Sequence, residues 1–272
     1  MADPMAAVVR LVDDGLKARN TAPPAIKPYK PVCAENNAAY AAANVQAASR
    51  SVCDALAAAG VALVHDFISA DEEAALLETV DGGAWEGTLS RRVQHYGHRF
   101  VYGSKTCAPV DRPLPPLVRA VCGRLPRRPW ANDEAAQVTV NEYEPGQGIS
   151  PHVDAHGAFA DGLYSLTLGA GVAMRLKKSR RADPDAPTHA LWLPPRALLC
   201  LRGEARYVYG HGITSRRGDN VGGAWVPRGR RVSLTFRGLP PPGPCACGFP
   251  DSCDAGGTAP LLLPTRLRPD GG

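Results

Sequence analysis

The stretch NEYEPGQGISPHVDAH, residues 141–156, combines a strand, a turn rich in Gly and Pro, and an extended H-x-D segment. Alternate residues of an extended segment point to the same face, so His152 and Asp154 can place an imidazole and a carboxylate on one metal ion. A single H-x-D pair is unremarkable in a chain of 272 residues, so this interpretation depends on further features of the sequence.

A third metal ligand has to come from elsewhere in the chain, and His211 is the best candidate. It follows a strand predicted at 206–209 and lies between two glycines, which leave room beside a metal. Two His and one carboxylate on one face leave the remaining coordination positions open, which is typical of non-haem Fe(II) oxygenases. His152, Asp154 and His211 are therefore the predicted iron ligands.

Short strand-sized segments separated by Gly or Pro dominate the second half of the chain. Many short strands with few helices are typical of a sandwich or a jelly roll, so we expect a mainly β fold with flanking helices. Helices are predicted at 69–80, where Ser69 and Glu72 have capping-box spacing, and at 114–125. The other predicted strands lie at 61–67, 164–168, 172–176, 190–193, 197–201 and 231–236.

The composition agrees with a turn-rich fold, because the chain has 28 Gly, 26 Pro and only 6% aromatic residues. The net charge of +5 is compatible with an anionic partner such as RNA without proving one. We find no signal-like segment and no apolar run near the roughly 20 residues that cross a bilayer. We therefore expect no membrane association and a cytoplasmic location, with the nucleus as an alternative, and hence reduced cysteines.

The strand RVSLTFR, residues 231–237, alternates polar and apolar residues, so one face is polar and carries Arg231 and Arg237. An arginine inside a barrel needs an anion, and a dicarboxylate such as 2-oxoglutarate supplies one. Arg231 is the main candidate for the distal carboxylate, and Arg237 is the second. Asn141 and Tyr143 share a face and could complete this co-substrate pocket, although Tyr143 could equally be packed in the barrel wall.

The ordered set N-x-Y, H-x-D, His and R-x5-R resembles the AlkB family of dioxygenases over roughly residues 61–254. Within that family it looks closest to the homologue-eight branch, which hydroxylates a wobble uridine side chain in tRNA. The resemblance implies a double-stranded β-helix (jelly roll) core, with Fe(II) and 2-oxoglutarate as cofactors. It is carried by NEYEPGQGI (141–149), PHVDAH (151–156), SLTLG (165–169), GEARY (203–207), HGIT (211–214) and RVSLTFR (231–237).

Two departures bear on the substrate. DNA-repair members of the family carry Asn two residues after the first Arg of the strand, where this chain has Ser233. The related tRNA enzyme also has an RNA-recognition domain and a methyltransferase domain, neither of which we find in these 272 residues. We therefore expect tRNA or other RNA as partner, together with a separate methyltransferase that makes the ester-bearing substrate.

Three functions stay open at this point. The favoured one is hydroxylation of 5-methoxycarbonylmethyluridine at the wobble position of the tRNA anticodon. The second is oxidative demethylation of N-methylated bases in RNA or DNA, because the same iron chemistry serves both. The third is a non-catalytic RNA- or protein-binding scaffold, against which the complete ligand set argues.

A second metal site is predicted from the cysteines Cys245, Cys247 and Cys253, which form a C-x-C-x5-C cluster. Three thiolates need a fourth ligand for tetrahedral zinc. The resemblance implies that His156, two residues past the iron Asp, supplies it and that the zinc is structural. Free surface cysteines are the alternative.

Residues 91–102, RRVQHYGHRFVY, mix cations with aromatic rings. The resemblance implies a lid over the nucleotide, where Arg contacts phosphate and aromatic rings stack on bases. An exposed edge hairpin is the alternative. The candidate substrate-binding residues, none of them catalytic, are Arg91, Arg92, Tyr96, Arg99 and Tyr102.

The chain is thus expected to have three parts. Residues 1–60 form an Ala-rich N-terminal extension that is partly helical, and residues 61–240 form the AlkB-like dioxygenase domain. Residues 241–272 form a C-terminal segment and tail linked to the domain by zinc.

Overall fold

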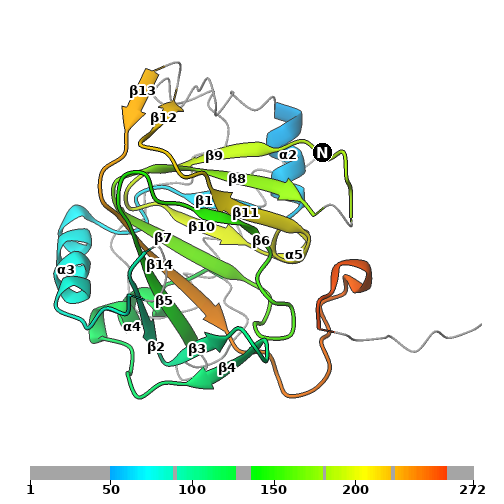
Figure 1. Cartoon of the computed structure of the whole chain (residues 1–272), viewed down its shortest axis with the longest axis horizontal. Helices are drawn as coiled ribbons and strands as arrows, with labels where there is room; N and C mark the ends of the chain where they lie inside the picture. Colours follow the sequence, from blue (N-terminus) through cyan, green and yellow to red (C-terminus); the bar gives the residue numbers. More distant parts are fainter. Residues whose placement is uncertain (1–49, 88–90, 127–135, 180–181, 222–223, 256–272) are drawn as a thin grey trace, which may run out of the picture.

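The structure is a computed structural model that describes residues 50–87, 91–126, 136–179, 182–221 and 224–255. The predicted extension before residue 50 and the tail after residue 255 lie outside these residues. Within them the protein is mainly β with flanking helices, as the sequence predicted (Figure 1). No described helix combines the length and the apolar character that crossing a bilayer requires.

A six-stranded antiparallel sheet forms one wall of the barrel, in the order β1-β10-β7-β14-β5-β2. Its strands are β1 Val61–Val64, β10 Leu198–Leu201, β7 Leu163–Gly169, β14 Arg231–Gly238, β5 Ala136–Tyr143 and β2 Val93–Tyr96. A four-stranded antiparallel sheet forms the opposite wall, with β6 Ile149–His152, β11 Tyr209–Ile213, β8 Val172–Lys178 and β9 His189–Leu193. Two facing antiparallel sheets of this kind make the jelly roll that the resemblance implied.

Two hairpins extend from the barrel at different places (Figure 1). One pairs β3 His98–Val101 with β4 Thr106–Pro109, and the other pairs β12 Gly218–Val221 with β13 Ala224–Pro227. The described helices are α2 Arg50–Ala58, α3 Ala70–Asp81, α4 Pro116–Gly123, α5 Gly203–Tyr207 and the short 3-10 helix η4 Pro250–Ser252.

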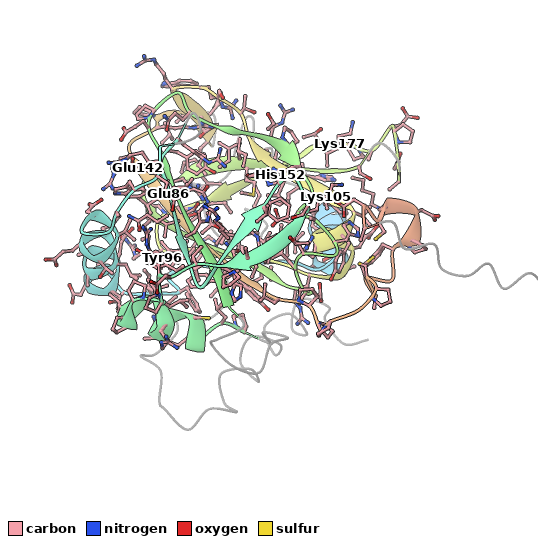
Figure 2. The ribbon with its side chains drawn as sticks, turned by 60° about the horizontal axis from the view of Figure 1, so that its bottom comes forward. Glu86, Tyr96, Lys105, Glu142, His152 and Lys177 are labelled. Atoms are coloured by element: carbon pink, nitrogen blue, oxygen red, sulfur yellow. The ribbon has the colours of Figure 1, made fainter. Side chains whose placement is uncertain are left out.

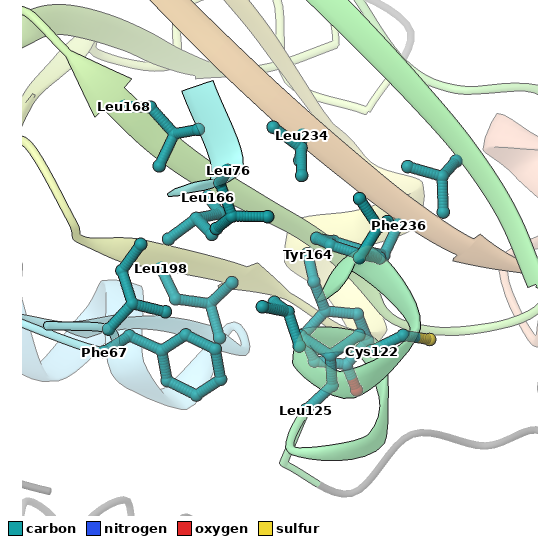
Figure 3. Close-up of a cluster of buried hydrophobic side chains, with 14 of the residues drawn as sticks. Phe67, Leu76, Cys122, Leu125, Tyr164, Leu166, Leu168, Leu198, Leu234 and Phe236 are labelled. Atoms are coloured by element: carbon teal, nitrogen blue, oxygen red, sulfur yellow. The ribbon is translucent and has the colours of Figure 1, made fainter. Parts of the chain in front are cut away.

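The outer face of the large sheet packs against α3 and α4 in one apolar core (Figure 3). Leu234 and Phe236 of β14 are fully buried there, beside Leu76 of α3 and Val118 of α4. Alternation along a strand then directs Arg231, Ser233, Thr235 and Arg237 to the inner face of the barrel. The alternating pattern of residues 231–237 therefore separates an apolar core from a polar interior.

Helix α3 begins where the sequence predicted. The Ser69 hydroxyl accepts a hydrogen bond from the Glu72 amide at 3.1 Å, and the Glu72 carboxylate accepts one from the Ser69 amide at 2.9 Å. This reciprocal pair is the predicted capping box, and it satisfies amides that the first helical turn leaves without partners.

Two predicted strands differ from the structure. The strand expected at 61–67 ends at Val64, because Asp66 adopts a left-handed conformation with φ of 46° that a strand cannot continue through. The strand expected at 206–209 is wrong, since residues 203–207 form α5 and β11 begins only at Tyr209. A segment of four residues is too short for its hydrophobic period to separate helix from strand.

Candidate metal and co-substrate site

The three predicted iron ligands meet on the inner face of the small sheet. His152 at the end of β6 and His211 in β11 are direct cross-strand partners, and their ring centroids lie 4.5 Å apart. Asp154 follows two residues after His152, and its Oδ1 lies 3.6 Å from His152 Nε2. One potential ligand atom from each of the three residues lies within 4.8 Å of the other two. These distances fit a His-Asp-His metal centre.

The protonation states also suit a metal. Burial alone would raise the pKa of Asp154, but the positive charge of Arg237, followed by smaller effects of His211 and Arg206, lowers that pKa below its ordinary value. Burial lowers the pKa of His211 to about 3, so its imidazole is neutral. A charged carboxylate and a neutral imidazole are the forms that bind a metal cation.

The ring of His152 is oriented by its own backbone. Its Nδ1 lies 2.9 Å from the carbonyl oxygen of Ser150, which can only accept, so Nδ1 carries a hydrogen and donates it. Nε2 is the nitrogen on the side of Asp154. In metal-binding histidines the ring nitrogen that does not bind the metal usually donates a hydrogen bond to a carbonyl or carboxylate, and this bond orients the ring.

Arg206 holds the segment that carries the carboxylate ligand, and sequence reasoning missed this role. Its guanidinium is buried and donates to the carbonyl of Asp154 at 2.8 Å and to that of Ala155 at 3.1 Å. A buried cation with such partners fixes the backbone on which the metal ligand stands. The residue lies in the GEARY segment, which the sequence predicted partly as a strand, and nothing in the local pattern marks its side chain as buried.

Arg231 is buried at the other end of β14, with 3% of its surface exposed. It donates to the Thr167 hydroxyl at 3.0 Å and lies over the Tyr143 ring, 5.4 Å from the centroid. Its Nε has no hydrogen-bond partner among the described residues. Burial lowers the pKa of Arg231 to about 10, so the group stays charged near neutral pH. An ionised guanidinium with an unused donor fits an anionic ligand such as the distal carboxylate of 2-oxoglutarate.

A pocket of about 230 Å³, counting the space open to solvent at its mouth, leads to Arg231. Tyr143 lines it, as do Gln147, Ile213 and Arg228. Beside it, Arg91 donates to the Asn141 side-chain oxygen at 3.1 Å and lies 5.6 Å from the Tyr143 ring centroid. The structure thus brings Arg231, Tyr143, Asn141 and Arg91 together along one side of the interior.

Arg237 lies at the metal end of the same strand face. Its Nε donates to Asp154 Oδ2 at 2.7 Å, and its Nη1 donates to Gln137 Oε1 at 2.9 Å. The two arginines of the R-x5-R strand therefore contact different groups in this structure. The role of Arg237 toward the co-substrate stays a prediction, since its described partners are the metal carboxylate and a glutamine.

The cysteine cluster meets His156 as the resemblance implied. His156 Nδ1 lies 3.3 Å from Cys247 Sγ, and potential ligand atoms of His156, Cys247 and Cys253 lie within 4.8 Å of one another. Burial, and to a smaller extent the neighbouring thiols of Cys253 and Cys247, raise the pKa of the Cys245 thiol to about 11. One imidazole and two thiols within ligand distance, with a third thiol nearby, form a donor set of the type that binds zinc.

Two of the predicted lid residues face away from the interior, and the burial of Tyr96 corrects its assignment to the substrate, whereas the role of Arg92 stays a prediction. Tyr96 is 4% exposed, packs in the outer core and donates to Gln94 Oε1 at 2.8 Å (Figure 2). Arg92 donates to Glu142 Oε1 at 2.7 Å on the outer face of the sheet. Alternation instead directs Arg91 and His95 inward, and sequence reasoning did not single out His95.

The remaining lid candidates belong to the β3–β4 hairpin. Arg99 is exposed, and Tyr102 is 75% exposed with its ring edge-on to Phe100 at a centroid distance of 5.0 Å. In Figure 2 the hairpin comes forward, with Lys105 at its turn. Exposed aromatic and cationic side chains on a hairpin are available for contact with a nucleotide.

The jelly roll, the His-Asp-His cluster and the buried arginine define the class of protein. Residues 85–237 match the 2OG-Fe(II) oxygenase superfamily, and the chain belongs to that superfamily, whose members are Fe(II)- and 2-oxoglutarate-dependent dioxygenases. His152, Asp154 and His211 are the residues that would hold the iron, and Arg231 is the residue that would bind the co-substrate.

Its relatives include ALKBH8 proteins, which confirms the AlkB resemblance. The chain is 37% identical over 217 residues to the alkylated DNA repair protein ALKBH8 homolog of Arabidopsis thaliana, an alignment that covers 72% of this chain and 62% of that protein. It is 36% identical over 223 residues to the tRNA (carboxymethyluridine(34)-5-O)-methyltransferase alkbh8 of Xenopus tropicalis, covering 72% of this chain and 34% of that protein.

A more distant relative carries a different activity in its name. The chain is 26% identical over 185 residues to a DNA N6-methyl adenine demethylase of Caenorhabditis elegans, covering 65% of this chain and 59% of that protein. The chain therefore spans less than two thirds of the length of each of these relatives.

Proposed function

We propose that this protein hydroxylates a modified wobble uridine, 5-methoxycarbonylmethyluridine, in the tRNA anticodon. The observation that carries the proposal is the pairing, inside one barrel, of the His-Asp-His cluster with a buried arginine that has a free donor. The two ALKBH8 relatives support the wobble uridine, because one of them has carboxymethyluridine at tRNA position 34 in its name.

The chain's own residues would act by binding and orienting. His152, Asp154 and His211 would hold Fe(II), and Arg231 would bind the distal carboxylate of 2-oxoglutarate. When bound, iron and 2-oxoglutarate activate O2, so that one oxygen atom enters a substrate C–H bond and the other leaves in succinate formed with CO2. Arg206 and Arg237 would keep the carboxylate ligand in place throughout.

Oxidative demethylation of an N-methylated base is the second candidate. The demethylase relative from Caenorhabditis elegans favours it, because the same iron chemistry on an N-methyl group releases formaldehyde. Ser233 argues against the DNA-repair form, since it replaces the Asn that such members carry. Only the first proposal, hydroxylation of the uridine, requires a partner methyltransferase, which would supply the uridine ester.

One experiment separates these functions. The full chain is incubated with Fe(II), ascorbate and 2-oxoglutarate, and with either tRNA that carries 5-methoxycarbonylmethyluridine or N-methylated oligonucleotides. Nucleosides and succinate are then measured by mass spectrometry, with His152→Ala as the inactive control. A gain of one oxygen on the uridine supports hydroxylation, and loss of a methylene unit supports demethylation. If neither an altered nucleoside nor succinate is detected, the result instead indicates a binding scaffold.

A further inference from the structure

A continuous chain of hydrogen bonds runs from the metal carboxylate across the inner face of the large sheet. Asp154 Oδ2 accepts from Arg237 at 2.7 Å, and Arg237 donates to Gln137 at 2.9 Å. Gln137 donates to the Thr139 hydroxyl at 2.6 Å, and that hydroxyl lies 3.3 Å from His95 Nδ1. The last link crosses from β5 to β2, where Thr139 and His95 are direct cross-strand partners.

The chain has a direction, because its first member can only donate. A guanidinium has no acceptor, so the Gln137 side chain must turn its oxygen to Arg237 and its NH2 group to Thr139. The Thr139 hydroxyl accepts that bond and has a single hydrogen to give. That hydrogen is available to the other described partner of the hydroxyl, His95 Nδ1. With Thr139 as the donor, Nδ1 accepts and the hydrogen of the neutral ring lies on Nε2, and the proposal below takes this direction.

The neutral state of His95 follows from its surroundings. The residue is half-buried on the inner face, and burial lowers its pKa below the ordinary value. The carboxylate of Glu86 opposes this shift, whereas the positive charges of Arg237, Arg99 and Arg112 add to it. A neutral imidazole with one nitrogen engaged offers a single defined donor at the other nitrogen.

We propose that His95 is a specificity residue, whose Nε2–H donates to a carbonyl oxygen of the substrate base. Uracil has carbonyl groups at positions 2 and 4, whereas cytosine has an amino donor at position 4 and adenine has no carbonyl. The hydrogen-bond chain that positions the metal carboxylate therefore also selects the base. This inference rests on the proposed function for the substrate, but the donor state of His95 does not.

The donor state is tested in the metal-free protein by ¹⁵N NMR of the His95 ring at pH 7. The Nε2–H tautomer is expected in the wild type and in Thr139→Ser, which keeps the hydroxyl. Thr139→Val removes the hydroxyl and is expected to populate both tautomers. Wild-type protein with the hydrogen on Nδ1, or with a charged ring, overturns the proposal.

Base selection is tested by binding of anticodon stem-loops to the metal-free protein, measured by fluorescence anisotropy. The wobble base is uridine, 2-thiouridine or cytidine, so each carbonyl is replaced in turn. We expect one replacement to weaken wild-type binding roughly tenfold, the cost of leaving a buried donor without its partner. His95→Ala should bind all three alike, and His95→Gln, which keeps an NH donor, should discriminate between them again.

The outcomes separate the inference from the function. Equal binding of all three stem-loops by the wild type, or discrimination that survives in His95→Ala, overturns the role of His95. Binding of no stem-loop by the wild type rejects the tRNA proposal instead, and the NMR result still decides whether His95 is a fixed donor. His189→Ala, at a half-buried histidine on β9, is the matched control and should discriminate as the wild type does.

Discussion

Arg231 and Arg237 lie on the same face of β14, yet the structure gives them different surroundings. Arg237 is neutralised by the Asp154 carboxylate at 2.7 Å. Arg231 has only a hydroxyl and an aromatic ring as described partners, although it is almost fully buried. A buried cation without an acid costs stability, so its presence indicates selection for a ligand rather than for the fold.

This difference predicts that a substitution of Arg231 weakens 2-oxoglutarate binding without lowering the free energy of unfolding. Arg231→Met should weaken 2-oxoglutarate binding by about 100-fold or more, because a charge-assisted pair is lost. The free energy of unfolding without 2-oxoglutarate should stay unchanged or rise by about 1–4 kcal/mol, since a buried charge is replaced by an apolar chain of similar volume. Calorimetry measures the first quantity and urea denaturation the second. Near-normal 2-oxoglutarate affinity in this variant would contradict the assignment of Arg231.

At the scale of elements, the described part of the C-terminal segment contacts three separate parts of the domain. Asp254 accepts from the His156 amide at 2.9 Å and pairs with Lys105 of the β3–β4 turn at 3.2 Å. Phe249 lies 5.6 Å from the ring of Tyr207 in α5. The segment thus links the loop after Asp154, the β3–β4 hairpin and α5, and Cys247 in the same segment lies 3.3 Å from His156.

Zinc would make this link rigid. We predict about one zinc per chain in the wild type and none in Cys247→Ser, measured by elemental analysis. The variant should also lose thermal stability, at roughly 2–4 °C in Tm for each kcal/mol lost. Cys107→Ser is the matched control, because Cys107 is half-buried and outside the cluster. An unchanged Tm together with no zinc in the wild type would remove the second metal from this protein.

At the scale of the whole molecule, a buried ion pair joins the β12–β13 hairpin to the small sheet and to the loops at the pocket end. Asp219 of β12 accepts from Arg228 Nε at 2.7 Å and from the Ala173 amide of β8 at 3.2 Å. Arg228, three residues before β14, also donates to the carbonyls of Thr214 at 2.8 Å and Gln147 at 3.3 Å. The loops around the Arg231 pocket are therefore tied to one carboxylate.

Acid sensitivity should follow from this carboxylate. Burial raises the pKa of Asp219, but the hydrogen bond and charge of Arg228 outweigh it and lower that pKa below its ordinary value of 3.8. A pKa that is lower in the folded state means that the charged carboxylate stabilises the fold above about pH 4. That stabilisation is lost as the pH falls through the folded-state pKa.

Asp219→Asn leaves Arg228 buried without its acid, so it should lower the free energy of unfolding by about 3–5 kcal/mol at pH 7. The difference from the wild type should shrink as the pH falls below the ordinary carboxyl pKa toward the lower folded-state pKa, where the wild-type group also becomes protonated. Urea denaturation at pH 7 and pH 3 measures both effects. Asp111→Asn, at an exposed aspartate, is the control, and a difference that is the same at both pH values would contradict the prediction.

Much of the fold and site could be predicted from the sequence because the deciding features are local. The H-x-D spacing places two ligands on one face whenever the segment is extended. The alternation along 231–237 and the capping box at Ser69 and Glu72 likewise depend only on neighbouring residues. These features predicted two of the iron ligands, the polar strand face that carries Arg231 and Arg237, and the start of α3.

Only the tertiary structure decided which face each lid residue occupies and which partner each buried charge finds. Successive residues of a strand point to opposite faces, and the register of β2 against β5 decides which face is which. In this register Tyr96 lies in the core and His95 in the interior. The pairing of His211 with His152, and of Arg206 with the Asp154 carbonyl, joins residues more than fifty positions apart. Such contacts depend on how whole strands pair, and no local pattern of residue types encodes that pairing.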